Sequence, residues 1–286
     1  GLLIGDERRL TMGQGRPFLL QMELESADAV DPERLAVLEA PLKTLLGLKK
    51  SLKRAENETN PQLSDDQLET AAAAVKDLSL QAEKTPYAAL VADIARDVES
   101  QQRRSGDVSK LAERFVGQTA ATLNLKALSG KAVAPDDSAQ KILVLHFWTY
   151  RGDPLVEPYG QVGYLEFLHG KRRKLGVNVY GVAVDARFGE AASQTAAKRD
   201  VQKLRDFMNL SYPIVLDDGQ FLARFGDPRR VGAKLPLWVV VGPDGKIAHY
   251  HAGVYDVKPD EGLRSLDEVV VELSKQQPPA EEKSTE

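Results

Sequence analysis

The stretch from His146 to Gly160 reads HFWTYRGDPLVEPYG, and it decides how the second half of the chain is interpreted. It continues an apolar run that starts at Lys141, KILVLHFW, which is typical of a strand buried on both faces of a sheet. A short turn follows. Asp153 and Pro154 then provide an N-cap and a first-turn proline for a helix. The order of strand, turn and helix predicts the start of an α/β layered unit.

Strand-like and helical patterns continue to alternate after this helix. Residues 177–185 and 212–218 are two further strand-like runs, and an amphipathic helical pattern over 190–210 separates them. Residues 235–253 read as two strands joined by the turn Pro243-Asp244-Gly245, and a helical pattern follows over 263–276. We therefore expect an α/β domain with a mixed central sheet flanked by helices.

The first half of the chain has helical patterns instead. One begins at Asp31 and Pro32, an N-cap and a first-turn proline. A second begins at Ser64, where Gln67 completes a capping box, and a third begins near Pro86. Before them, residues 17–25 form one strand-like run. These patterns predict a mostly helical N-terminal domain. The sequence thus predicts a helical domain over 1–118, the α/β domain over 119–275 and a disordered tail over 276–286.

Composition limits the classes of function. The net charge of −4 gives no reason to expect nucleic acid as a partner, and no apolar run approaches the roughly 20 residues of a membrane span. The 286 residues contain no cysteine.

Four segments of the second half resemble, in this order, the TlpA-like and redoxin branch of the thioredoxin-fold thiol-disulfide proteins. They are LVLHFW, VYGVAVD, YPIVLDDGQFLARFG and KLPLWVVVGPDGKIAHYHAG. The resemblance implies a thioredoxin-like three-layer domain over about residues 119–275. It also implies a cis-proline at Pro236 and a periplasmic or otherwise envelope-associated protein.

The turn departs from this family. If Phe147-Trp148 is aligned with the family's Phe-Trp pair, the C-x-P-C tetrad falls on Gly152, Asp153, Pro154 and Leu155. If instead Pro158 is the family's helix-kink proline, Tyr150 and Asp153 hold the cysteine positions. Neither alignment contains a thiol. Disulfide exchange requires a thiolate and a second thiol, so the turn reads as a degenerate active site in which Asp153 caps a helix.

Two functional hypotheses follow. The first is a non-enzymatic binding or scaffold protein of the cell envelope, which binds an extended peptide by main-chain hydrogen bonds in an apolar groove. The groove walls expected from the resemblance are Trp148, Tyr150, Leu235, Pro236 and Trp238, with core packing as the plainer interpretation of both tryptophans. The second is a cysteine-independent activity at His146, Tyr150 and Asp153. It requires these side chains to converge in a pocket with His146 open to solvent, whereas a buried core histidine is the plainer interpretation.

Other polar residues give weaker signals. His249 and His251 are two positions apart and face one side of a strand, as a metal pair would, but the sequence suggests no third ligand. Asp185, Asp217 and Asp218 follow strands and read as caps or surface acids. We therefore predict no metal and no cofactor.

Overall fold

The computed structural model describes residues 5–10, 18–25, 29, 31–53, 63–133, 140–151, 161–172, 175–255, 257 and 261–275. Several predicted features lie outside these residues. They are the four turn positions Gly152, Asp153, Pro154 and Leu155, together with Pro158 and the tail 276–286.

A six-stranded sheet forms the centre of the second half, in the order β3-β6-β5-β4-β7-β8. The strands are β3 (Lys126–Ala127), β4 (Ile142–Trp148), β5 (Val177–Val184), β6 (Ile214–Asp217), β7 (Leu237–Val241) and β8 (Ile247–Ala252). β4, β5 and β6 are parallel, whereas β7, β8 and β3 pair antiparallel to their neighbours. The predicted mixed sheet is confirmed.

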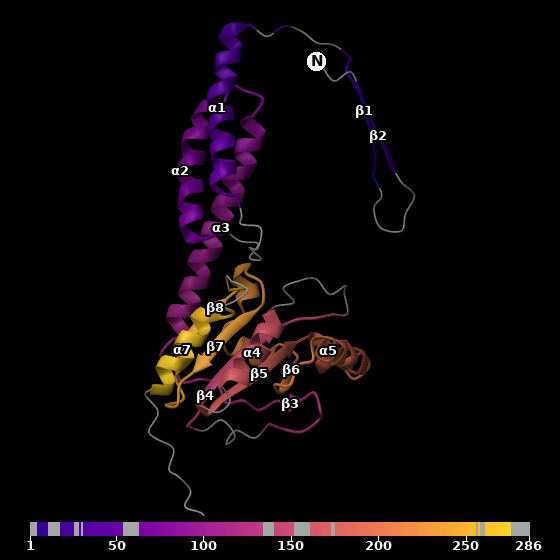
Figure 1. The fold of residues 1–286 in the computed structure, drawn as a ribbon, viewed down its shortest axis with the longest axis vertical. Helices are drawn as coiled ribbons and strands as arrows, with labels where there is room; N and C mark the ends of the chain where they lie inside the picture. The colour runs from indigo at the N-terminus through magenta and orange to yellow at the C-terminus, as the bar shows by residue number, and fades with distance from the viewer. Residues whose placement is uncertain are drawn as a thin grey trace, which may run out of the picture.

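Helices cover both faces of this sheet (Figure 1). They are α4 (Val162–Arg172), α5 (Gln194–Met208), the short α6 (Gln220–Ala223) and α7 (Arg264–Lys275). Alternate residues of β4 enter two separate hydrophobic clusters, because successive side chains of a strand point to opposite faces. One cluster includes Leu165 of α4 and Leu266 of α7, and the other includes Phe221 of α6. The domain therefore has the three predicted layers.

Three helices form a bundle in the first half: α1 (Pro32–Ser51), α2 (Asp65–Ala82) and α3 (Ala88–Phe115) (Figure 1). Asp31 caps α1, and the capping box of Ser64 and Gln67 is present at the start of α2. The bundle has a small hydrophobic cluster of its own, which includes Leu78. α3 is longer than the sequence indicated, since it runs without a break through Gly106 and ends only at the sheet.

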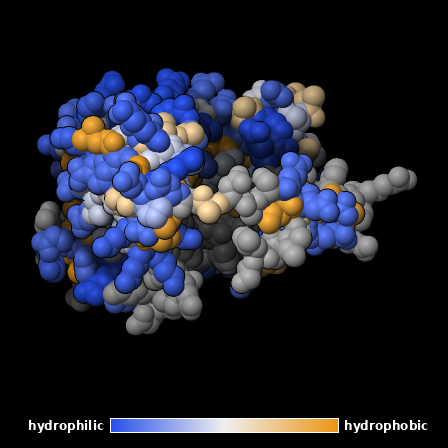
Figure 2. All heavy atoms as spheres, turned by 90° about the horizontal axis from the view of Figure 1, so that it is seen from above, coloured by the Kyte–Doolittle hydropathy of each residue, from blue (hydrophilic) through white to orange (hydrophobic). Residues whose placement is uncertain are grey.

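Ahead of the bundle, β1 (Gly5–Leu10) pairs antiparallel with β2 (Phe18–Glu23). β2 corresponds to the predicted strand-like run, but the charged β1 gave no such signal. In Figure 2 the surface seen from above is mostly hydrophilic, with apolar side chains scattered in small patches. Among the described residues, no helix has both the length and the apolar character needed to cross a membrane. The division of the chain at residue 118 stays a prediction.

Candidate functional site

The C-terminal end of β4 lies beside the loop that precedes β7. His146 is paired with Trp238 and Phe147 with Leu237, so the turn after Trp148 starts next to Pro236. The peptide bond between Leu235 and Pro236 is cis, as predicted. The described start of the turn, residues 149–151, therefore follows a strand end that lies beside the cis-proline loop, and the four turn positions lie outside the described residues.

With respect to the described residues, Leu235 has an open backbone. Its half-buried side chain packs against the cluster that contains Phe221, but its backbone forms no hydrogen bond with another described residue. The carbonyl of the next residue, Pro236, accepts a hydrogen bond from the Gly253 N–H at 2.7 Å, so that residue is fixed to the end of β8. An extended segment could thus pair with the chain at Leu235.

The structure corrects the expected role of the two tryptophans. Trp148 and Trp238 are 1% and 0% exposed, so neither ring is a wall of an open groove. The reason is the register: β4 and β7 are interior strands, and both indoles lie on the sheet face that α4 and α7 cover. Pro236 is also buried, which leaves Tyr150 and Leu235 as the half-buried members of the expected groove.

His146 is a core residue. It is 0% exposed, and its imidazole stacks on the indole of Trp238 with the ring centroids 3.7 Å apart. The alternative activity requires this imidazole to reach solvent, and it does not. Asp153, the third member of that proposed site, lies outside the described residues.

The two histidines of β8 belong to an aromatic cluster around Tyr255. Its hydroxyl shares a hydrogen bond with His249 Nε2 at 2.7 Å, and its ring stacks on His251 at 4.0 Å and meets Trp238 edge-on at 5.5 Å. Burial lowers the pKa of His249 and raises the pKa of the Tyr255 hydroxyl. Both groups are therefore neutral near pH 7.

Gln161, the residue before α4, fixes this cluster. Its side-chain amide donates to the Tyr255 carbonyl and accepts from the Tyr255 N–H, both at 2.8 Å. Sequence reasoning missed Gln161 and Tyr255, since no motif marks a glutamine and a tyrosine 94 positions apart. No group of three or more His, Cys, Asp or Glu suited to a metal occurs in the described part of the chain.

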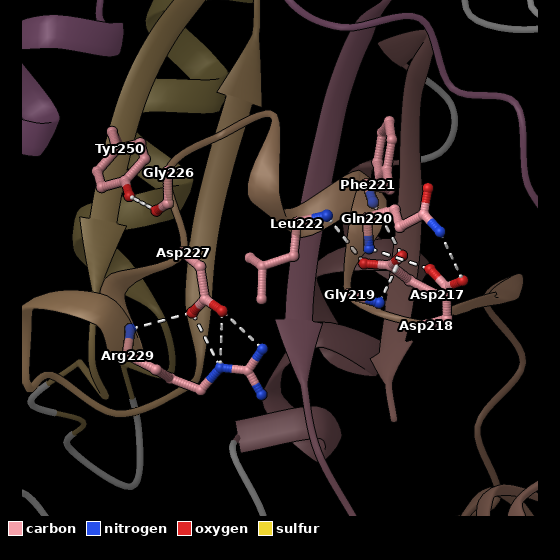
Figure 3. A network of polar contacts seen from close by, with 10 residues as sticks. All are labelled: Asp217, Asp218, Gly219, Gln220, Phe221, Leu222, Gly226, Asp227, Arg229 and Tyr250. Carbon is pink, nitrogen blue, oxygen red and sulfur yellow. Dashed lines mark hydrogen bonds and ion pairs between the residues drawn. The ribbon is translucent and has the colours of Figure 1, made fainter. Parts of the chain in front are cut away.

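The aspartates at strand ends act as caps. Asp217 is 1% exposed and accepts hydrogen bonds from the backbone N–H groups of Gly219, Phe221 and Leu222 at 2.8–3.0 Å (Figure 3). Asp185 accepts from the Arg187 N–H and pairs with the Arg187 guanidinium. Their interpretation as caps is confirmed.

The last turn of α3 supports the segment that leads into the cis-proline loop. Phe115 stacks on Tyr250, and the Tyr250 hydroxyl donates to the Gly226 carbonyl at 2.8 Å (Figure 3). Gly226 has a φ of +73°, and a β-carbon there would lie 2.5 Å from the Phe115 ring. Only glycine suits both the backbone conformation and the close contact. The end of the bundle thus contacts the segment that leads into the loop.

Asp227 and Arg229 rigidify the same segment. Asp227 caps the 3-10 turn Pro228–Val231 by accepting from the Arg229 N–H, and it also accepts from the Arg229 guanidinium (Figure 3). Burial alone would raise the pKa of the Asp227 carboxyl, but the hydrogen bonds from Arg229 outweigh it and the net pKa is lowered. The turn that precedes the cis-proline loop is therefore stabilised by several hydrogen bonds.

Comparison with known proteins agrees with this geometry. Residues 116–250 match the model of the AhpC/TSA family. Together with the sheet order, this match identifies residues 116–250 as a redoxin-like domain of the thioredoxin fold, without cysteines. No curated protein matches the sequence.

Several solved structures are similar to somewhat more than half of the chain. A putative thiol:disulfide interchange protein DsbE from Chlorobium tepidum is 20% identical, with a TM-score of 0.41, over 56% of this chain and 97% of that one. A secreted disulfide oxidoreductase of Mycobacterium tuberculosis is 18% identical, with a TM-score of 0.39, over 53% of this chain and 96% of that one. A putative protein disulfide isomerase from Bacteroides thetaiotaomicron is 19% identical, with a TM-score of 0.44, over 56% and 90%.

Proposed function

We propose that this chain is a non-catalytic binding protein, which holds an extended peptide segment of an envelope protein against its cis-proline loop. The observation that carries the proposal is the open backbone of Leu235 beside cis-Pro236, in a redoxin-type domain that contains no cysteine. The loop that relatives use to hold a substrate is present, and the sulfur that would react with it is absent.

The chemistry supports binding over disulfide exchange. Exchange proceeds by attack of a thiolate on a disulfide through a mixed-disulfide intermediate, and peroxide reduction passes through a sulfenic acid. No side chain of these 286 residues can form either species. Binding requires only main-chain donors and acceptors and a neighbouring apolar surface.

The surroundings of the loop favour an extended ligand. Lys234 is exposed and, like Leu235, forms no backbone hydrogen bond with another described residue, so two successive residues have main-chain groups that the described part of the chain leaves unpaired. Tyr150, which is half-buried just after β4, packs against the cluster on the sheet face that α4 and α7 cover, whereas Leu235 packs against the cluster on the other face. The proposed groove therefore runs along the main chain of Lys234 and Leu235, beside the buried cis-Pro236.

The test is selection of peptides from a random 12-residue library with the full-length protein, followed by calorimetric titration. We expect selected peptides to bind wild type and Leu90→Arg, a control at an exposed position of α3, with equal affinity. Leu235→Arg should bind them at least about tenfold more weakly, because the new side chain and its charge occupy the groove. Amide chemical shifts of Lys234, Leu235 and Gly253 should change on binding to the wild type.

Two results would contradict the proposal. One is that the library yields no peptide whose affinity responds to Leu235→Arg. The other is reduction of insulin disulfides by dithiothreitol in the presence of the protein at a rate clearly above background. The envelope location rests on the family resemblance alone, and fractionation of native cells tests it separately.

A further inference from the structure

A cavity of about 420 Å³ lies where the helical bundle meets the edge of the sheet. α2 contributes its first turn, α3 contributes one face, and the end of β8 and Ala233 of the cis-proline loop complete the lining. A volume of this size fits a small organic molecule, and such sites are common between structural units. This cavity is separate from the open backbone of Leu235, which is not among its lining residues.

The face of α3 supplies polar groups at helical spacing. Gln101 is three and four positions before Arg104 and Ser105, and Val108 is four and three positions after them, so all four lie on one side of the helix, toward the cavity. Arg104 also reaches the cis-proline loop, since its Nε lies 3.9 Å from the position of a β-carbon at Gly232. The guanidinium is therefore placed between the bundle and the loop.

Among the described residues, Arg104 has no ion-pair partner. Its side chain is half-buried, yet it forms no ion pair with any residue in the part of the chain that the structure describes. A guanidinium presents several N–H donors in a planar fork that matches a carboxylate or phosphate. Removing such a group partly from water without a direct ion pair is unfavourable, so an anionic ligand that reaches the guanidinium would stabilise it.

The other lining groups decide between the two kinds of anion. The carboxylate of Asp65 lines the same cavity and accepts a hydrogen bond from the Ser105 hydroxyl at 3.0 Å. This negative charge would repel a phosphate dianion more strongly than a carboxylate. Leu63, Leu68 and Val108 add an apolar wall, which suits a hydrocarbon group.

We propose that this cavity binds a small organic molecule with a single carboxylate, which Arg104 holds while the hydrocarbon part rests against Leu63, Leu68 and Val108. This site is independent of the peptide groove, and either could exist without the other. Because α2, α3 and the loop all contribute to it, the ligand would also strengthen the attachment of the bundle to the sheet.

The probes are hexanoate, 4-methylpentanoate and phenylacetate, each compared with its primary amide and with inorganic phosphate, and titrated into the full-length protein. We expect at least one carboxylate to bind with a Kd below about 1 mM. Its amide, which has the same shape and no charge, should bind roughly tenfold more weakly, as should phosphate. This comparison uses the unaltered protein, so it does not depend on whether a variant folds.

Arg104→Gln keeps much of the side-chain stem and removes the charge. It should reduce carboxylate binding to the level of the amide, whereas the matched control Arg103→Gln, at an exposed position next to it, should bind as wild type does. Equal binding of carboxylate and amide, no effect of Arg104→Gln, or no binding of any of the three carboxylates up to about 10 mM would each overturn the proposal. If the protein fails this test but binds peptides at Leu235, the proposed function still holds.

Discussion

The sheet and the helical bundle differ in how much of each they bury. All seven residues of β4 are buried, whereas the 20 residues of α1 have only Pro41 and Leu48 buried. In α3 the buried residues are Val91 and Val98 alone, out of 28. Burial of apolar surface is the main favourable term in folding. We therefore expect the free energy of unfolding of the bundle to be much smaller than that of the sheet domain.

This difference can be measured separately in the two regions. Both tryptophans of the chain, Trp148 and Trp238, lie in the sheet, so indole fluorescence reports on that region. The circular dichroism signal at helical wavelengths reports on the helices of both the bundle and the sheet domain. In urea we expect the helical signal to begin to fall before the fluorescence changes.

The largest expected effect is in the sheet core. Phe147 is 0% exposed and packs against Phe221 and Phe225, with ring centroids 5.9 and 5.4 Å away. Phe147→Ala should lower the free energy of unfolding by about 3–5 kcal/mol through lost burial and the cavity it leaves. The fluorescence transition in urea measures this. Leu46→Ala, at a position 57% exposed, should stay within about 0.5 kcal/mol.

A second substitution tests the bundle alone. Leu78 is 0% exposed in the cluster formed by α1, α2 and α3. Leu78→Ala should destabilise the bundle by about 2–5 kcal/mol, which moves the helical transition to lower urea. The fluorescence transition should move much less. If both signals shift together, the two regions unfold as one unit and the comparison fails.

The contact between the two regions predicts a third effect. Gly226→Ala places a methyl group against the Phe115 ring and requires an unfavourable positive φ, so we expect a loss of about 1–3 kcal/mol. Gly117→Ala is the matched control. Its φ of +84° carries the same conformational cost, but nothing lies within 4 Å of the added carbon. The difference between the two melting curves isolates the packing of α3 on the loop segment, and equal curves would show that this packing contributes nothing.

The sequence predicted features that depend on short-range chemistry. The capping box at Ser64, the turn at Pro243-Asp244-Gly245 and the buried strands each follow from neighbouring residues. Resemblance added cis-Pro236, which periodicity alone could not indicate. The predictions that failed or were missed depend on long-range pairing. The register of β4 against β7 buries both tryptophans, and the bonds of Gln161 to Tyr255 join distant segments.

The smallest expected effect concerns acid stability in the sheet domain. Asp267 of α7 accepts hydrogen bonds from Arg172 and Lys171 of α4. Burial alone would raise the pKa of the Asp267 carboxyl, but these hydrogen bonds outweigh it and hold the pKa below its usual 3.8. The unfolded chain therefore binds this proton more readily. The stabilisation is present in full above the unfolded pKa and is lost as the pH falls through 3.8 toward the folded pKa.

Asp267→Asn should therefore flatten the fall of the fluorescence-detected unfolding free energy at acid pH, while costing about 1 kcal/mol or less at neutral pH. Glu268→Gln is the control, because Glu268 is an exposed partner of Arg264 on the same helix. Its pH profile should match that of the wild type. If Asp267→Asn instead leaves the slope unchanged, the pairing of α4 with α7 does not contribute to the sheet's greater stability, and that stability rests on apolar burial alone.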